Sequence, residues 1–460
     1  MFFICHIHLI KTVTPIWFLL LLGAAFNFAG YFMIWLVVAG KITKPKIWQM
    51  CIYICIGANS QNSANTGALV TSVKNFPESR GSMIGLLKGY TGLIGAIMIQ
   101  IYLAVYGNDS KSLILLIAWL PAAISILFVY TIRDVKPINT PMSLNVFYHF
   151  LTISIVLAVF LMALNLLEKI ITFSEGGYIA SATLVSFLVV LPLVISIREE
   201  LLIWNVKKQA IDPPTGITVE RPKPKAVSPK QGDEKSRDDY TVLQALTSID
   251  MWVLFLSTFC GLGSSLTAVD YLGQIGESLG YPNKTVTSFV SLVSIWNFFG
   301  RVFAGFVSEI MVVKYRLPRP LMMTMVLLLA CVGYLLVAFP FPGSLYIASI
   351  VTGFSFGAQL PMNLTIVSEL FGLKYYSVLF NLVQLASLLG SFVFNVKTTG
   401  TLYDKAAMKD LTKKGLRRLP FIVLASVTFF GALSSLILVI RTRNFYSSDI
   451  CKKFKENTEN

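Results

Sequence analysis

Charged side chains are scarce in this sequence. Only 13% of its 460 residues are charged, whereas 55% are hydrophobic, and the mean hydropathy is +0.70. Soluble globular domains carry roughly 25% charged residues. Stretches of about twenty residues, apolar on all sides, recur along the chain, and this is the length of a helix that crosses a bilayer. A soluble α/β enzyme would alternate short strands with amphipathic helices. The sequence therefore predicts an all-α, polytopic membrane protein whose main partner is the lipid bilayer.

Histidine and cysteine are also few, with three and six residues. Cys51 and Cys55 share a helix face, but a structural metal site needs about four ligands, and no disulfide framework is visible. The sequence has no glycine-rich phosphate loop followed by Lys-Ser or Lys-Thr, and no histidine cluster or paired carboxylates within the apolar spans. We therefore expect no catalytic residues, no metal and no cofactor, which argues against an ATP-driven pump and a membrane hydrolase.

The net charge of +15 comes from 38 Lys and Arg against 23 Asp and Glu. No basic stretch interleaves with aromatic residues as a nucleic-acid-binding module would, so we expect no nucleic-acid partner. In a membrane protein such an excess reflects basic residues held in cytoplasmic loops. Counting these residues loop by loop predicts that both termini are cytoplasmic, although the loops at 41–46 and 397–418 disagree. The sequence does not indicate which cellular membrane holds the protein.

Twelve stretches have membrane-crossing length. They are 16–39, 47–73, 82–105, 111–132, 147–166, 179–203, 250–271, 285–308, 319–339, 344–368, 375–396 and 419–441. The first fifteen residues lack a signal-peptide layout, so we expect 16–39 to be a retained helix. Residues 205–249 are rich in proline and charge and poor in large apolar residues, which predicts a flexible basic cytoplasmic linker. Residues 444–460 form a predicted cytoplasmic tail.

An internal repeat relates the two sides of this linker at an offset of about 300 residues. Gly57-Ala58 recurs as Gly357-Ala358, and Gly30-Tyr31 recurs as Gly333-Tyr334. Two similar halves are typical of a transporter that binds its solute between them. The span 319–339 matches 16–39, yet two spans precede the former and none precedes the latter. We therefore expect a bundle at 1–133 without its opening hairpin, two extra helices at 134–204 and a six-helix bundle at 250–443, in a 4 + 2 + 6 order.

Neutral polar side chains interrupt the second span. Asn59, Asn62 and Thr66 follow at helical spacing and share one face. Such groups are costly in hydrocarbon unless they are bonded, so they line a solute path or form hydrogen bonds between helices. The matching span of the second half carries similar residues, which favours a path. The candidates for this path are Asn59, Asn62, Asn65, Thr66, Gln359 and Asn363.

Charged residues at predicted cytoplasmic helix ends are candidates for a gate that opens and closes with transport. In this interpretation Arg80 pairs with an acidic residue of another helix end, and Arg301 and Glu309 form a latch at the inner surface; the alternative is ordinary interfacial charge. The gate candidates are Lys74, Glu78, Arg80, Arg301 and Glu309.

Three other features are singled out on the spans. Small residues from Gly81 to Ala96 form a stripe that predicts close helix packing. Lys88, beside the stripe, is expected to extend to the cytoplasmic interface. Asp270 is a candidate for proton coupling, or else an exposed residue of the outer interface.

Several segments together resemble a known family. The stretch FPESRGSMIGLLKGYTGLIGA is similar to a helix turn of major facilitator superfamily carriers of the monocarboxylate and oxalate–formate type. GRVFAGFVSE resembles a divergent form of that superfamily's loop signature, with Gly300 at the usual acidic position. GANSQNSANTGALVTSVKNFPESRG, LTAVDYLGQIGESLGYP and FGAQLPMNLTIVSELFGLKYYS resemble the plant nodulin-like family, including its nuclear fusion defective group. This resemblance implies a major-facilitator fold and a first half that normally begins with two further helices.

These observations lead to one functional expectation and one rival. We expect a secondary active or facilitative transporter that moves a small polar or anionic solute by alternating access. The rival is a non-transporting membrane sensor or scaffold, or an inactive truncated carrier. Neither the solute nor the coupling ion can be named from the sequence.

Overall fold

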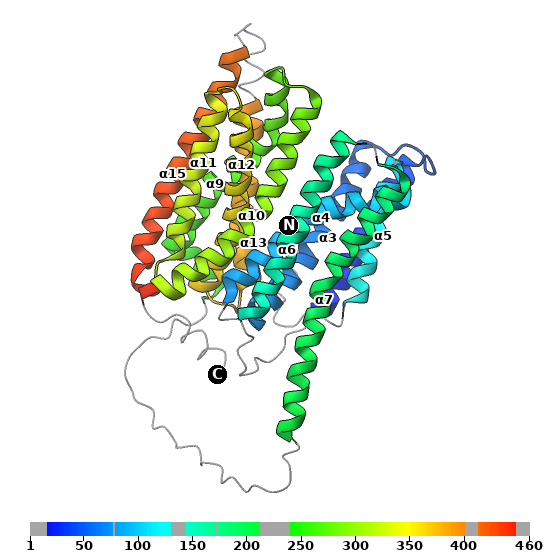
Figure 1. Cartoon of the computed structure of the whole chain (residues 1–460). Coiled ribbons are helices and arrows are strands. Elements are labelled where there is room, and N and C mark those ends of the chain that lie inside the picture. The colour runs from blue at the N-terminus through cyan, green and yellow to red at the C-terminus, as the bar shows by residue number, and fades with distance from the viewer. Residues whose placement is uncertain are drawn as a thin grey trace.

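The computed structural model describes residues 16–76, 79–107, 109–129, 144–171, 173–211, 240–400 and 413–447, and these ranges contain helices and connecting turns but no strand (Figure 1). The helices of the N-terminal part are α2 (Ile16–Val38), α3 (Ile47–Asn75), α4 (Arg80–Tyr106), α5 (Ser110–Leu127), α6 (Leu144–Ile170) and α7 (Glu175–Ile211). Those of the C-terminal part are α8 (Val242–Thr247), α9 (Ile249–Ser278), α10 (Asn283–Tyr315), α11 (Arg319–Ala338), α12 (Ser344–Leu370), α13 (Tyr376–Ser391), the π-helix η2 (Phe392–Gly400) and α15 (Lys413–Ser447).

Helices occupy all twelve ranges in which the sequence predicts spans, within the described residues. Ten of them are long and apolar enough to cross a membrane. The other two are α3, which the polar stretch after Gly57 interrupts, and α5, whose apolar part is the short segment Lys111–Leu127. The prediction of an all-α polytopic membrane protein is therefore confirmed. Ten of its described helices are long and apolar enough to span a bilayer.

Local residue chemistry sets several helix ends. Arg316 adopts a left-handed backbone conformation with φ 53°, and Pro318 precedes the first turn of α11, so α10 stops at Tyr315. Proline suits the start of a helix because its missing N–H has no partner there in any case. Gly343 precedes α12 with φ 81°, a conformation that costs glycine little.

Two groups of helices make up most of the molecule, and we call α2–α5 the N-terminal group and α9–α15 the C-terminal group. In the first, α2 packs mainly on α3 and α5, and in the second, α11 packs in the same way on α12 and α15. Gly30 of α2 lies against the backbone of Gly57, and a Cβ built at Gly333 of α11 would lie 2.9 Å from the hydroxyl of Thr352. Gly30 and Gly333 therefore each face the next helix along the chain, but the second pair differs, because Gly57 packs on Tyr31 of α2 and Gly357 on the backbone of Asn297 in α10.

The helices α6 and α7 belong to neither pattern. Both pack against α4, and α7 extends past its neighbours at the end where it finishes with Ile211 (Figure 1). The same end contains the start of α9 at Ile249. We call this the linker end of the molecule.

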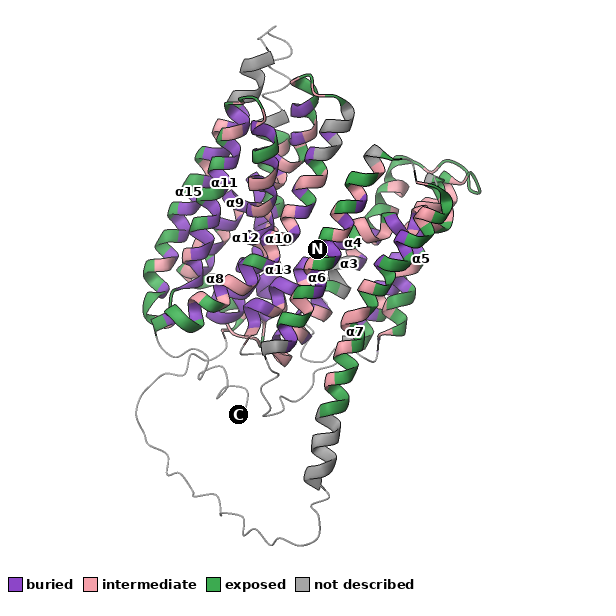
Figure 2. Cartoon of the chain, in the orientation of Figure 1, coloured by how far each residue is buried: buried purple, intermediate pink, exposed green. Residues whose placement is uncertain are grey.

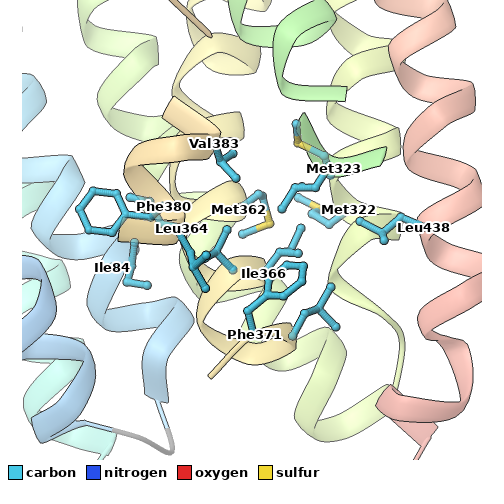
Figure 3. Packing of buried hydrophobic residues seen from close by; sticks show 14 of the residues in the cluster. Ile84, Met322, Met323, Met362, Leu364, Ile366, Phe371, Phe380, Val383 and Leu438 are labelled. Carbon is cyan, nitrogen blue, oxygen red and sulfur yellow. The ribbon is translucent and has the colours of Figure 1, made fainter. Parts of the chain in front are cut away.

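The largest buried cluster lies at the linker end of the C-terminal group. Figure 3 shows Met322 of α11, Met362 of α12, Phe371 directly after α12 and Leu438 of α15, together with Ile84 of α4. Ile84 is fully buried, so a residue of the N-terminal group completes the core of the C-terminal group. Buried residues are dense in this group, whereas exposed ones dominate the lower part of α7 (Figure 2).

Candidate functional site

The two groups meet where α4 crosses α10 near the linker end. A Cβ built at Gly85 would lie 2.7 Å from the Cα of Gly305, and one built at Gly305 would lie 2.6 Å from the carbonyl oxygen of Gly81. Only residues without a side chain allow backbones to approach so closely. The prediction that the small-residue stripe is a packing face is confirmed for these positions. Further along α4, a Cβ at Gly95 would meet nothing within 4 Å.

A buried ion cluster lies beside this crossing, and its members are Glu309, Arg319 and Glu369. The Arg319 Nε donates to both carboxylate oxygens of Glu369, at 2.7 and 2.8 Å, and its Nη2 donates to Glu309 Oε2 at 3.0 Å. The side chain of Arg319 is fully enclosed, so each hydrogen bond replaces one that water would otherwise make. Breaking such a pair by removing one partner costs about 3–5 kcal/mol.

Neutral hydroxyl groups complete the shell of the ion cluster. Ser308 accepts a hydrogen bond from Arg319 Nη1 at 2.7 Å, and Tyr446 of α15 donates to Glu369 Oε2 at 2.8 Å. The cluster therefore joins α10, α11, α12 and α15 at one end of the C-terminal group.

The first residues of α4 connect the N-terminal group to this cluster. The backbone N–H of Gly81 donates to Glu309 Oε2 at 2.8 Å, and Arg80 Nη1 donates to the carbonyl oxygen of Ser368 at 3.0 Å. The positive end of a helix dipole favours a carboxylate, so Glu309 is well placed at the start of α4. The first turn of α4 thus lies beside Glu309, Arg319 and Glu369; the pairing of Arg80 with an acidic residue stays a prediction, since the bond described for Arg80 is to a backbone carbonyl.

Arg301 lies outside the ion cluster and contacts α4 on its own, so its part in a latch stays a prediction. Its Nη1 donates to the carbonyl oxygen of Lys88 at 2.7 Å and to the hydroxyl of Thr91 at 2.8 Å. Arg301 precedes Glu309 by eight residues of α10, which is about 12 Å along the helix axis. Two gate candidates remain. Lys74 is half-buried in the last turn of α3, and Glu78 lies outside the described residues.

Lys88 is buried and does not extend to an interface, so that expectation is also wrong. Only 5% of the residue is exposed, and its Nζ donates to Asn65 Oδ1 at 2.8 Å. The amide of Asn65 thus holds a cation of the neighbouring helix α4.

The other polar residues of α3 divide into separate environments. Asn59 donates to the carbonyl oxygen of Cys55 in its own helix at 2.8 Å, Thr66 is buried, and the side chain of Asn62 lies outside the described residues. On an adjacent face Ser60 donates to Asn27 Oδ1 at 3.2 Å, and Asn27 donates to two carbonyl oxygens of α5 at 2.9 Å. This second set holds α2, α3 and α5 together.

Gln359 and Asn363 lie inside the C-terminal group and face α9. Gln359 Nε2 donates to Ser265 Oγ at 2.9 Å, and Asn363 Oδ1 accepts from Thr258 Oγ1 at 3.1 Å. Gly261 leaves room for the glutamine, because a Cβ there would lie 2.5 Å from Gln359 Oε1. Within the described part of the chain, Gln359 Oε1 and Asn363 Nδ2 are buried and have no hydrogen-bond partner. One free acceptor and one free donor thus lie a helical turn apart.

Asp270 lies in an exposed position near the end of α9 that is opposite the linker end. Its Oδ2 accepts a hydrogen bond from Asn395 of η2 at 2.8 Å, with no ion pair to Asp270 among the described residues. Asp270 therefore connects α9 to a π-helix, a form often found at functional sites.

Sequence reasoning did not select Arg319 and Glu369, which the structure makes prominent, and it assigned Lys88 to the interface. Glu369 directly follows the predicted end of the span 344–368, and Arg319 is the first residue of the predicted span 319–339, so each was taken as a helix flank. A carboxylate in the last turn of a long apolar span was the available signal. For Lys88 the signal was its place two turns inside a glycine-rich span.

Comparisons with known proteins agree with this architecture. A family model described as Nodulin-like matches residues 7–197, and another, described as the C-terminal domain of NFD4, matches residues 237–448. The protein NUCLEAR FUSION DEFECTIVE 4 of Arabidopsis thaliana is 25% identical over 464 residues, covering 94% of this chain and 78% of the relative. The probable transporter MCH1 of Wickerhamomyces anomalus is 22% identical over 166 residues, covering 36% of this chain and 34% of the relative.

Among solved structures, the major facilitator superfamily proton:xylose symporter XylE bound to 6-bromo-6-deoxy-D-glucose is similar, with a TM-score of 0.53 and 12% identity. The similarity covers 91% of this chain and 78% of the symporter. A double tryptophan mutant of XylE has a TM-score of 0.55 at 12% identity, covering 97% and 84% of the two chains. At such identity the similarity indicates a common fold.

Proposed function

Because this chain belongs to the nodulin-like and NFD4 family, whose fold is that of the major facilitator superfamily, we propose that it is a secondary carrier that moves a small polar or anionic solute by alternating access. The protein is an integral, multi-pass membrane protein of a transporter family and not an enzyme.

One observation carries the proposal: polar contacts join the two groups at the linker end. Arg80 and Gly81 of α4 bond to Ser368 and Glu309, whose neighbours form the buried ion cluster. Figure 1 shows the helices of the two groups diverging toward the opposite end. In our proposal this is a carrier closed at its linker end. We assign that end to the cytoplasm, with both chain termini there, as the basic residues of the sequence indicate.

Twelve membrane crossings suit this carrier. In our proposal α3 and α5 cross the membrane with the ten apolar helices, since Asn65 of α3 and a backbone carbonyl of α5 bond to side chains of neighbouring helices. The order is then four helices, the α6–α7 pair, and six helices.

The path in this proposal uses the amides of the two groups. Gln359 and Asn363 support it because each retains a buried atom without a partner, which a solute hydroxyl or carboxylate could satisfy when the C-terminal group opens. Asn59, Asn62, Asn65 and Thr66 remain the proposed lining of the opposite side.

Asp270 remains the proposed coupling group, and its environment supplies the reason. A carboxylate that is bonded to a neutral amide can gain a proton without leaving a buried cation unpaired, whereas Glu369 cannot, because Arg319 depends on it. The similar fold of the proton:xylose symporter XylE is consistent with proton coupling in this chain.

Solute uptake into vesicles tests the function. The purified full chain is reconstituted, and uptake of a panel of labelled sugars, amino acids and organic anions is compared with that of the double variant Asn59→Leu and Asn363→Leu. We expect at least one solute to accumulate and its uptake to be lost in the double variant. A matched control is Asn381→Leu, because the Asn381 amide also donates to its own helix, at Ser377. Uptake that is equal in all three proteins, or absent for every solute, favours the non-transporting sensor or scaffold.

A further inference from the structure

A buried cation, Lys88, and a half-buried one, Arg301, lie where α4 meets α10, away from the ion cluster. Lys88 is 5% exposed, and the guanidinium of Arg301 is bonded to the carbonyl oxygen of Lys88 itself at 2.7 Å. The Thr91 hydroxyl joins the backbone of Lys88 to the guanidinium, since it donates to the same carbonyl at 2.7 Å and accepts from Arg301 at 2.8 Å. One helical turn of α4, from Lys88 to Thr91, therefore carries the lysine and also binds the side chain of Arg301.

Neither cation has a counter-ion in the described part of the chain. The ion pairs recorded there join Arg319 to Glu309 and Glu369, and Arg441 to Asp250. Lys88 donates to the neutral amide of Asn65, and Arg301 Nε is buried without any hydrogen-bond partner. Ionisable side chains inside membrane spans are costly, and they are usually paired or face a solute pathway.

The surroundings of the two cations are polar and partly open. Asn65 and Thr91, which bond to the two cations, are both exposed although they lie in the middle part of α3 and α4. Gly92, one turn further along α4, also faces Arg301, because a Cβ built there would lie in ordinary contact with Arg301 Nη1, at 3.7 Å. The polar partners of both cations are therefore accessible from outside the helix packing.

We propose that Lys88 and Arg301 form a binding site for the oxyanion group of a small anionic solute, shared between the N-terminal and C-terminal groups. The guanidinium offers directed N–H donors, and the ammonium adds a point charge, a combination that suits a carboxylate or a phosphate. Because one cation comes from each group, a bound anion neutralises charge from both and favours the state in which they are close. This inference rests on the proposed carrier function and narrows its solute from polar or anionic to anionic.

Binding to the purified full chain tests the site without requiring transport. The Tm of the protein in detergent is measured with sodium acetate, sodium succinate, inorganic phosphate or sodium sulfate, at equal ionic strength, and with xylose as a neutral solute. We expect a concentration-dependent rise in Tm with at least one anion and none with xylose. Because carboxylates and inorganic anions are tested separately, the response also shows which of these two classes of oxyanion binds.

Variants connect any response to this site. Lys88→Met and Arg301→Gln should each abolish the anion-dependent rise, and Lys88→Met should raise the Tm without anion, because it removes an uncompensated buried charge. Lys88→Arg retains the charge and should keep part of the response, which guards against a variant that fails to fold. Lys314→Met is the matched control, since Lys314 is exposed on α10.

The outcomes separate this proposal from the carrier function. A rise that survives in Lys88→Met and Arg301→Gln, or no rise with any anion, overturns the anion site. If vesicles then still take up a neutral solute, the carrier function stands without the site. An anion response that depends on both cations, in a protein that moves no solute, supports the site and contradicts the carrier.

Discussion

Gly85 of α4 and Gly305 of α10 touch backbone to backbone, with a Cβ at Gly85 placed 2.7 Å from the Cα of Gly305. This contact is next to the bonds from Arg80 and Gly81 to the C-terminal group. The closest approach of the two groups therefore depends on two residues that lack side chains.

Gly85→Ala should force this crossing apart. We expect a loss of about 1–3 kcal/mol in the free energy of unfolding, because the added methyl group meets backbone that cannot rotate away. Gly95→Ala, on the same helix, meets nothing within 4 Å and should stabilise by up to about 1 kcal/mol through helix propensity. Chemical unfolding of both variants in the same detergent measures this difference. Equal effects of the two substitutions would contradict the close crossing.

Arg319→Gln should be among the most damaging single changes at the linker end. It leaves Glu369 and Glu309 buried without their cation, for an expected loss of about 3–5 kcal/mol. The double variant Arg319→Met and Glu369→Leu should lose less than Arg319→Met alone, because it removes the stranded charge as well. Thermal unfolding of the wild-type protein, of Arg319→Met and Glu369→Leu alone, and of the double variant gives the coupling.

Arg441→Gln is the control for this experiment. Arg441 is paired with Asp250, but 42% of its side chain is exposed, so its loss should cost at most about 1 kcal/mol. A loss equal to that of Arg319→Gln would show that burial does not determine the effect.

Gln100→Leu should loosen the α6–α7 pair from α4. Gln100 Nε2 donates to Glu168 of α6 at 2.7 Å, and its Oε1 accepts from Ser181 of α7 at 3.0 Å. Leaving these groups without partners should cost about 1–3 kcal/mol. Hydrogen exchange should rise in α6 and α7 while that of α11 and α12 is unchanged. The exposed Gln274→Leu is the control, and faster exchange across the whole chain would contradict a local role.

Asp270→Asn should remove the dependence of solute uptake on a proton gradient if Asp270 carries the coupling. The amide cannot bind or release a proton, but it can still bond to Asn395. Uptake into vesicles is measured with and without an inward proton gradient, beside the exposed control Glu277→Gln. An Asp270→Asn protein that still responds to the gradient would assign coupling to another group.

The sequence was sufficient to predict the helices, because runs of about twenty apolar residues leave few alternatives in a bilayer. The repeat stays a prediction, although Gly30 and Gly333 each pack on the next helix along the chain. Helix ends were less predictable: α10 extends to Tyr315 because the break depends on the left-handed conformation of Arg316, which no residue type announces.

The candidate site was harder to predict than the fold, since its partners come from distant segments. Arg80 was singled out, but its bond to the carbonyl of Ser368 spans 288 positions and involves backbone. Lys88 and Arg301 were assigned to interfaces because a single sequence shows charge and not depth. Their contact depends on the crossing angle of α4 and α10, which is a property of the packed helices.

Alternating access is the central claim, and distances between spin labels test it most directly. In a protein without its native cysteines, one pair is placed at Leu127 and Lys374 near the linker end, and a second at Val105 and Glu277 near the opposite end; all four positions are exposed. When a transported solute is added, the account predicts that the population with a long 127–374 distance and a short 105–277 distance grows. Distances that stay fixed at both ends under every solute tested would contradict it.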